Sequence, residues 1–296
     1  MNFRPVAAAL VFATLASPLQ AAPPARSEAL SPVESARRDA VERFLRARLF
    51  AADGEFQEAL KEFRRAVELD PGDGHLRREY AEALRDFGIL PEAEEQARKA
   101  VELVPGSAAA HRVLGQILLS KARDKEGIEA ALPELKRAND LQPAEPSGAL
   151  ALGQAYLRLD RPEEAATVLS RVQDRVRGPM LPLLYGEALE KAGKPDEAEE
   201  VYLGILRQDA ENPAASLGLL RVYQTTRKFD KALPILADLV KRQPGNLGLR
   251  AQYGFALLRA RRLDEAEKTF KEVLAADPDN RDALRHYSSL LSERLE

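Results

Sequence analysis

The side chains best suited to catalysis or metal binding are scattered along this sequence. The three histidines, His75, His111 and His286, are far apart, and none has a second histidine or a Glu-x-x-His partner at ligand spacing on one helix face. His75 and Glu79 lie one helical turn apart, but two ligands make a poor metal site. Carboxylate pairs, including any that could serve a glycosidase, lie in Glu-, Lys- and Arg-rich segments where pairing along a helix explains them equally well. We therefore predict no metal, no cofactor and no catalytic residue.

The composition and the missing motifs favour a folded protein that is not an enzyme. The sequence contains no GxxxxGK[ST], no GxGxxG after a strand and no GxSxG. It has no Cys, which excludes a disulfide framework, a thiolate zinc site and a Cys nucleophile. The net charge of -3 gives no bulk reason to expect nucleic acid, and a hydrophobic content of 45% is enough to bury a core.

The first residues have the order of a secretory signal. Residues 1–5 include one Arg, residues 6–16 form an apolar run, and small residues stand at Ala21 and Ala22. The run is too short to span a bilayer comfortably. We predict a cleaved signal peptide over residues 1–21, a flexible linker rich in Pro, Ser and Ala over residues 22–39, and no transmembrane segment after cleavage. The alternative is that the apolar run is retained as an anchor.

The rest of the chain repeats with a period near 34 residues. The stretch EFQEALKEFRRAVELDPGD, residues 55–73, returns as RLDEAEKTFKEVLAADPDN, residues 262–280, with the Ala, the Phe and the Asp-Pro in step. Gly or Ala recurs at position 8 of the frame and Ala at position 20, where two helices would cross closely, and Pro at position 32 would end the second helix. The frames predict seven repeats and a C-terminal capping helix at residues 40–73, 74–107, 108–145, 146–178, 179–212, 213–246, 247–280 and 281–296.

Two local features follow from these frames. The Asp-x-x-Glu spacing of Asp196 with Glu199 and of Asp264 with Glu267 can cap the free amides of a second helix. The terminal helix is expected to cover the open end of the array with three side chains facing inward, namely Leu284, Tyr287 and Leu291.

The frames resemble the tetratricopeptide repeat family from about residue 40 to the end. That family has Leu-Gly and Tyr in a first helix, Ala and Phe in a second helix and Pro in the next turn. LGQAY at 152–156 and YGEAL at 185–189 match the first helix, whereas EEAATVL at 163–169 and DEAEEVY at 196–202 match the second. The sequence departs from the pattern by lacking Trp and by having Arg177 where the fourth repeat should have Pro. The resemblance implies an all-α fold, a right-handed superhelical solenoid of helix-turn-helix repeats.

The resemblance also implies a partner-binding groove, because the first helices of this family line a concave face. Arg and Gln there would donate hydrogen bonds to a peptide backbone or carboxylate, and apolar residues would seat side chains. The simpler alternative is that this face is the solvent-exposed side of the first helices and binds no partner. The family positions predict a groove formed by Phe44, Arg48, Arg78, Glu82, Arg112, Gln116, Leu150, Gln154, Arg158, Met180, Leu183, Glu187, Leu217, Arg221, Gln224, Phe255 and Arg259.

Some relatives grip a free C-terminal carboxylate with Lys and Asn at fixed positions. Arg112 and Gln116 imitate one half of that clamp, but Ala151 stands where the second Asn is expected, so we do not predict chaperone-tail binding. The resemblance and the signal together imply a non-catalytic protein–protein scaffold of the periplasm or envelope. Similar proteins assist secretion, polysaccharide export or cytochrome maturation. The alternative is a glycan-binding accessory of polysaccharide export, with Phe44 and Phe255 as its main aromatic contacts.

Overall fold

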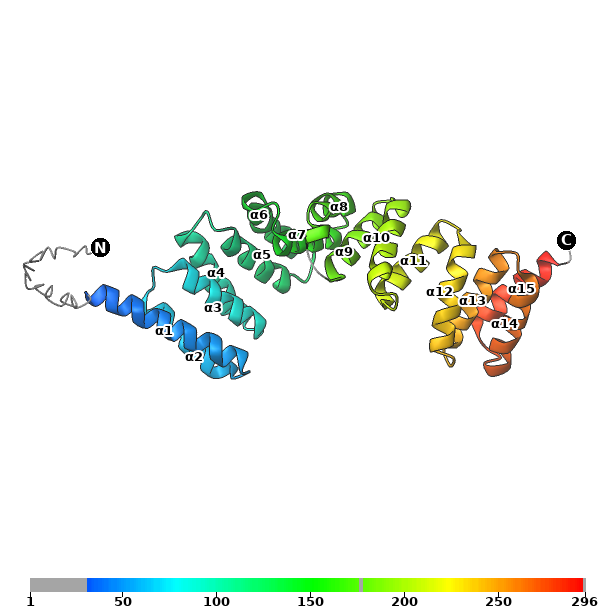
Figure 1. Ribbon diagram of the computed structural model, residues 1–296, viewed down its shortest axis with the longest axis horizontal. Helices are drawn as coiled ribbons and strands as arrows, with labels where there is room; N and C mark the ends of the chain where they lie inside the picture. The colour runs from blue at the N-terminus through cyan, green and yellow to red at the C-terminus, as the bar shows by residue number, and fades with distance from the viewer. Residues whose placement is uncertain (1–30, 176–177, 295–296) are drawn as a thin grey trace, which may run out of the picture.

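The computed structural model describes residues 31–175 and 178–294, which form α-helices and one short 3₁₀ helix and contain no strand. The predicted all-α solenoid is confirmed (Figure 1). The predicted signal peptide, residues 1–21, and residues 22–30 of the predicted linker lie outside the described residues. The elements are α1 (Pro32–Ala52), α2 (Phe56–Leu69), α3 (Gly74–Asp86), α4 (Leu90–Leu103), α5 (Ala108–Lys121), α6 (Lys125–Leu141), α7 (Pro146–Arg158), α8 (Pro162–Ser170), η1 (Gln173–Arg175), α9 (Met180–Lys191), α10 (Pro195–Gln208), α11 (Pro213–Thr225), α12 (Phe229–Arg242), α13 (Leu247–Arg259), α14 (Leu263–Ala276) and α15 (Arg281–Glu293).

Odd-numbered helices from α1 to α13 are the first helices of the seven repeats, and even-numbered ones are the second helices. From α3 to α13, every first helix begins within one residue of its predicted frame. Each second helix packs against the first helix of its own repeat and that of the next. Neighbouring first helices also contact one another from α3 to α11, so they form the inner layer of an elongated array (Figure 1).

Short polar side chains determine where most first helices begin. Each accepts hydrogen bonds from free amides of the first turn, as N-cap residues do. α9 is an exception, because Pro179 precedes it and makes no such bond. The capping residues of α3, α5, α7, α11, α13 and α15 are Asp73, Ser107, Glu145, Asn212, Asn246 and Asn280.

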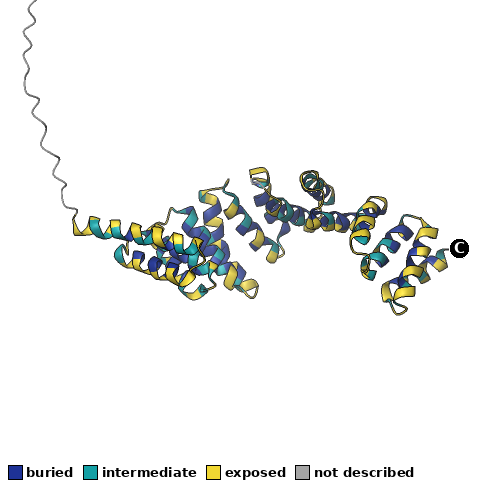
Figure 2. Cartoon of the chain, turned by 60° about the horizontal axis from the view of Figure 1, so that its bottom comes forward, coloured by how far each residue is buried: buried dark blue, intermediate teal, exposed yellow. Residues whose placement is uncertain are grey.

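The core runs along the array as two adjoining clusters of buried side chains, visible as dark blue in Figure 2. One cluster extends from Ala40 to Ile117 and the other from Leu119 to Leu290, and Leu118 packs against both. The predicted alanines at position 20 are all 0% exposed, which confirms that they lie at close helix crossings. They are Ala59, Ala93, Ala131, Ala165, Ala198, Ala232 and Ala266.

At position 8, glycine makes room for a large side chain of the second helix. A Cβ at Gly153 would lie 2.9 Å from Leu169 Cδ2, and one at Gly254 would lie 2.7 Å from Phe270 Cε1. In the fifth repeat, Tyr202 fills this place and is 1% exposed. A Cβ at Gly186 would lie 2.7 Å from Tyr202 Cε1. Such distances are shorter than packed carbon atoms adopt, so these crossings need glycine.

Tyr202 is also enclosed from the next repeat. A Cβ at Gly218 of α11 would lie 2.4 Å from Tyr202 Cζ, so the ring lies between two glycines of different first helices. The sixth repeat has Leu220 at position 8, and Gly218 lies two residues before it. The Tyr202 hydroxyl donates to Glu190 Oε2 at 3.3 Å, which satisfies the polar end of this buried ring.

Both ends of the array differ from the sequence-based expectation. α1 begins at Pro32, so residues 32–39 of the predicted linker are helical, and Ser31 with Glu34 forms a capping box at its start. In α15, Leu284 and Leu291 are 47% and 44% exposed, which contradicts the predicted inward orientation. The buried residues are Ala283 and Leu290, because α15 packs on α13 and α14 and no further helix of the described residues covers its outer side.

The fourth repeat is irregular where its Pro is missing. Its second helix, α8, has 9 residues, whereas α10 and α12 have 14, and the 3₁₀ helix η1 follows it. Arg177 itself lies outside the described residues. None of the helices in the described ranges combines the length and apolar character needed to cross a bilayer.

The expected Asp-x-x-Glu caps are not formed. The N-cap residues of α10 and α14 make no side-chain cap bond. Asp196 instead lies 2.7 Å from Lys228 of the next repeat. Glu267 binds Lys271 at 2.7 Å and Arg294 at 2.8 Å. These carboxylates pair with basic side chains of their own helix or of the next helices and leave the helix amides uncapped.

Glu199 is the most enclosed carboxylate of this kind, at 7% exposed. It accepts hydrogen bonds from Lys228 at 2.8 Å, Lys231 at 2.6 Å and the Tyr223 hydroxyl at 3.1 Å. Burial alone would raise its pKa, but the hydrogen bonds from the two lysines and the tyrosine lower the pKa to about 2. Glu199 therefore joins the fifth and sixth repeats through its ionised form.

Replacing Gly186 by Leu should separate α9 from α10, because the new side chain would overlap the Tyr202 ring. We expect the free energy of unfolding, measured by urea titration, to fall by about 1–3 kcal/mol. Gly245→Leu is the matched control, since nothing lies within 4 Å of a Cβ at Gly245. Equal stability of the two variants would contradict the predicted crossing.

Replacing Glu199 by Gln should lower stability at pH 7 by about 1–3 kcal/mol, because the two lysines lose the carboxylate charge and one of its two acceptor oxygens. The folded-state pKa of Glu199 lies below its ordinary value of 4.5, so the carboxylate stabilises the fold above that pH, and its contribution disappears as the pH falls toward 2. Urea titrations over this range should show the difference between wild type and variant shrinking. Glu200→Gln removes the same charge from an exposed position of α10 and serves as control. A difference that stays constant with pH would refute the assignment.

Candidate functional site

A groove crosses the inner layer at α7, α9 and α11 and has a volume of about 690 Å³. It brings together seven of the residues predicted for the partner-binding face, from three repeats. Position 5 of the frame contributes Leu150, Leu183 and Leu217, and position 9 contributes Gln154, Glu187 and Arg221. Each of the three repeats therefore supplies one leucine and one polar or charged side chain to the groove. The residues that line the groove are Leu150, Gln154, Pro179, Met180, Leu183, Leu184, Glu187, Tyr202, Ala214, Leu217 and Arg221.

The floor of the groove is apolar and partly open to solvent. Met180 is 67% exposed and Leu217 44% exposed, whereas Leu150 and Leu183 are half-buried. Tyr202 reaches the groove from the second-helix layer, because only glycine stands between its ring and α9 and α11. The family positions could not predict Tyr202, since they concern first helices alone.

The polar rim of the groove is electrically balanced. Arg221 donates to both oxygens of Glu190, at 2.8 and 3.1 Å. The hydrogen bond to Glu190 is the main reason that the pKa of Arg221 is raised. Glu187 lies 2.8 Å from Lys191, one turn along α9. Both charged members of the predicted set therefore already have partners within the chain.

The arginines predicted for the N-terminal part of the face are also paired internally. Glu79 lies 2.8 Å from Arg48 and 2.5 Å from Arg78. Glu82 lies 3.4 Å from Arg78 and 3.6 Å from Arg112. Each of the three arginines thus has a carboxylate partner within the chain, and the two carboxylates offset two of the three positive charges, which weakens the expectation that an arginine line selects an acidic partner.

Arg112 and Gln116, which imitate one half of a carboxylate clamp, are likewise hydrogen-bonded within the chain. Arg112 donates to Gln116 Oε1 at 3.0 Å, and Arg85 donates to the same oxygen at 2.6 Å. Arg158 donates to the backbone oxygens of Leu119 and Ala122, both at 3.0 Å, and so caps the end of α5. These side chains stabilise the inner layer.

The two aromatic candidates for sugar stacking contact other rings. Phe44 lies 6.0 Å from Phe63 and 6.0 Å from His75, measured between ring centroids. Phe255 lies 5.8 Å from Phe229 and 4.4 Å from His286.

The Arg259 guanidinium lies 5.8 Å from the centroid of the Phe229 ring, and Gln224 is half-buried in α11. These residues are distributed over both ends of the array and do not form one site with the groove.

The histidines are explained by packing and by hydrogen bonds. His111 is 8% exposed, and its ring nitrogens lie 2.6 Å from Glu134 Oε2 and 2.9 Å from the Pro105 oxygen. Burial lowers the pKa of His286, which packs on Phe255. No group of three or more His, Asp or Glu side chains within residues 31–175 and 178–294 is arranged to hold a metal ion.

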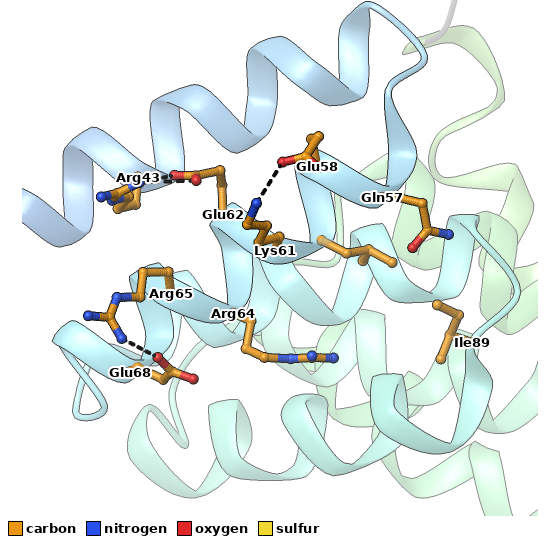
Figure 3. Close-up of a pocket in the computed structure, with 10 residues that line it drawn as sticks. Arg43, Gln57, Glu58, Lys61, Glu62, Arg64, Arg65, Glu68 and Ile89 are labelled. Atoms are coloured by element: carbon orange, nitrogen blue, oxygen red, sulfur yellow. Dashed lines mark hydrogen bonds and ion pairs between the residues drawn. The ribbon is translucent and has the colours of Figure 1, made fainter.

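A second hollow, of about 680 Å³, lies beside α2 and is rich in charged residues (Figure 3). Its basic side chains are each paired with a carboxylate, so the hollow offers a partner no unbalanced charge. The pairs are Arg43 with Glu62 at 2.9 Å, Lys61 with Glu58 at 3.2 Å, Arg64 with Glu92 at 3.2 Å and Arg65 with Glu68 at 2.9 Å.

Stacked helix pairs with an open inner groove define the class of helical repeat proteins. Three models described as tetratricopeptide repeat match the chain, at residues 44–108, at residues 79–211, and at residues 189–244 and 225–291. The chain belongs to the tetratricopeptide repeat family, as the resemblance of its sequence predicted.

Among curated proteins, the chain is similar to DnaJ homolog subfamily C member 3 of Homo sapiens, with 29% identity over 106 residues. The match covers 36% of this chain and only 21% of that protein, so it spans about a fifth of the length of the relative.

Several solved structures share the fold over most of the chain. The C-terminal part of a repeat protein from Cytophaga hutchinsonii has a TM-score of 0.63 and 16% identity, and the match covers 82% of this chain and 98% of that one. PilF of Pseudomonas aeruginosa has a TM-score of 0.59 and 19% identity, covering 72% and 96%. YrrB, a repeat protein with an unusual peptide-binding site, has a TM-score of 0.55 and 22% identity, covering 68% and 97%. These likenesses concern the fold alone.

Proposed function

We propose that the chain is a non-catalytic scaffold that binds a segment of a partner protein in the groove of α7, α9 and α11. Its membership of the tetratricopeptide repeat family supports a role in protein–protein interaction. The observation that supports this particular groove is its apolar floor, where Leu183 and Leu217 stand at equivalent places of neighbouring repeats and Met180 is exposed beside them. A contiguous apolar surface with a polar rim is typical of an interaction site.

The chemistry of the groove favours a partner segment that inserts apolar side chains. Leucine and methionine gain stability from being covered, by roughly 25 cal/mol for each Å² removed from water. The rim pairs Arg221 with Glu190 and Glu187 with Lys191, so it attracts neither acidic nor basic segments strongly. Gln154 is exposed and can both donate and accept a hydrogen bond. An amphipathic helix or an extended segment with regularly spaced apolar residues fits these features.

The similar structure YrrB has an unusual peptide-binding site, and that protein shares 22% sequence identity with this one. No observation on the described residues favours glycan binding, because Phe44 and Phe255 are engaged with other rings. The protein-segment proposal therefore has the stronger support.

We place this function in the bacterial envelope, where such scaffolds assist secretion, polysaccharide export or cytochrome maturation. The support is the order of the first residues, with one Arg, an apolar run at residues 6–16 and small residues at Ala21 and Ala22. A partner in the same compartment would meet the groove after export.

Charged substitutions in the groove floor should weaken partner binding. A photo-crosslinking amino acid in place of Leu183 should capture the partner in the native envelope, and one at Glu129, exposed on α6, should not. With the purified partner, Leu183→Asp combined with Leu217→Asp should weaken affinity at least about tenfold, or 1.4 kcal/mol. Calorimetric titration measures this loss, and circular dichroism should show unchanged helicity.

The double variant Arg112→Glu with Arg221→Glu measures the contribution of the arginines to affinity separately from that of the apolar floor. Because both arginines already have internal partners, we expect a smaller loss of affinity than from the leucine pair. Unaltered affinity in the leucine pair, or an equal loss in the arginine pair, would reject the apolar floor as the binding determinant.

Export should remove residues 1–21. N-terminal sequencing of the protein recovered from a periplasmic extract should then begin at Ala22. Protein that retains Met1 and fractionates with the cytoplasm would rule out the proposed location while leaving the groove proposal untouched.

A further inference from the structure

A pocket of about 640 Å³ lies between η1, α9 and α10, where the second helix of the fourth repeat is short. We call it the Tyr185 pocket. Its apolar wall includes Tyr185, Leu189 and Ile205, which are 9%, 1% and 6% exposed. It shares only Pro179 with the residues that line the groove of α7, α9 and α11, so the two are separate sites.

The first two repeats show which side chain occupies the equivalent place beside a longer second helix. Arg64, at position 25 of the first repeat, lies 3.2 Å from Oε1 of Glu92, at position 19 of the second repeat. The hydroxyl of Tyr80, at position 7, donates to the same oxygen at 2.6 Å. A guanidinium, a carboxylate and a phenol thus form one cluster between two repeats, and Tyr80 is 1% exposed.

The same cluster is incomplete between the fourth and fifth repeats. Tyr185 and Glu197 stand at positions 7 and 19, so the phenol and the carboxylate recur. Position 25 of the fourth repeat is Ser170, the last residue of α8, so the guanidinium does not recur there. The Tyr185 hydroxyl makes no hydrogen bond to residues 31–175 or 178–294, although the residue is nine-tenths buried. Glu197 has only a half-exposed partner, Lys194, at 3.2 Å.

The charge around the pocket favours a cation. Burial and the nearby charge of Glu197 raise the pKa of Tyr185, so its hydroxyl keeps its proton and can donate at neutral pH. The apolar wall below the carboxylates suits a charged group on an apolar stem. Among the described lining residues the basic one is Arg207, and the acidic ones are Asp174, Glu197, Glu200 and Asp209.

We propose that the Tyr185 pocket binds an arginine side chain of a partner protein, which takes the place that Arg64 has between the first two repeats. The guanidinium donates to Glu197 and to the Tyr185 oxygen, and the methylene stem covers Leu189 and Ile205. The surface pair of Glu197 with Lys194 opposes this little, because such exposed pairs contribute little stability. Lysine fits less well, since it lacks the planar pair of donors. This contact goes beyond the proposed function, because it lies outside the groove.

Filling the pocket from within the chain tests the equivalence of the two clusters. Ser170→Arg supplies a guanidinium at position 25, and we expect it to raise the melting temperature as it joins Tyr185 and Glu197. Ser170→Gln adds length without charge and should leave the melting temperature as in wild type. Equal melting temperatures of the two variants would contradict the proposed cluster.

A pair of peptides tests binding directly. The probe is a fluorescent peptide, acetyl-Gly-Leu-Arg-Leu-Gly-amide, and its match carries neutral citrulline in place of arginine. By fluorescence anisotropy with the full chain, we expect the arginine peptide to bind at least about tenfold more tightly. Glu197→Gln, Tyr185→Phe and Ser170→Arg should each remove this preference. Glu163→Gln, at an exposed position of α8, should keep it.

The stability of Tyr185→Phe distinguishes binding from a structural role. Its melting temperature should equal that of wild type, whereas Tyr80→Phe should melt earlier because it loses the bond to Glu92. No binding of the arginine peptide, equal affinity for both peptides, or full affinity in Glu197→Gln would overturn the proposal.

Two further variants assign the arginine to its site. Leu183→Asp with Leu217→Asp should leave the affinity for the arginine peptide unchanged, so this proposal and the groove proposal can fail separately. A loss in that double variant would place the arginine in the groove and overturn the proposal. Binding that is seen only after Arg177→Gln would assign the pocket to an arginine of the chain itself, which also overturns it.

Discussion

The array depends on a close contact, made in most repeats, between a large side chain of the second helix and a small residue of the first. Where position 8 is glycine, Leu135, Leu169, Tyr202 or Phe270 occupies the space that a Cβ would need. Because interiors pack densely, the first helix cannot carry a larger side chain there unless the repeat changes its geometry. The alanines at position 20, all fully buried, allow the same close approach. Repetition of these contacts gives the chain its regular curvature and its inner layer of first helices.

This constraint connects the stability of the array to the candidate site. Tyr202 is buried between Gly186 and Gly218, and it also reaches the groove between α9 and α11. The spacing of the first helices sets the distance between the leucines of the groove floor, so the groove exists before any partner arrives. A preformed surface avoids the entropic cost of ordering helices on binding. The same buried ring therefore holds two repeats together and supports the surface that we propose for binding.

The repeat pattern predicted the fold closely, because small and large residues at fixed positions determine which helices cross. The first helices from α3 onward begin where the frames placed them. The pattern failed at the two ends of the array, which no neighbouring repeat covers within the described residues: α1 starts earlier than position 1, and α15 buries Ala283 in place of Leu284. It located the groove leucines, because they recur in register. It could not show that Arg112 meets Glu82, since that pairing joins side chains of adjacent repeats whose distances only the structure gives.

Internal charge pairing decides what the inner face can recognise. Carboxylates that bind arginines of the next repeat, as Glu82 and Glu190 do, stabilise the stacking and also remove charge from the surface. A neutral partner that covers such an ion pair leaves the pair intact and has to offset its desolvation, whereas an acidic partner would also have to displace its carboxylate. Discrimination at the groove must then come from the shape of Met180, Leu183 and Leu217 and from the hydrogen bonds of Gln154. Arginines that are paired within the chain attract charged segments only weakly over long distances. The groove that we propose for binding would therefore select its partner segment by the fit of apolar side chains.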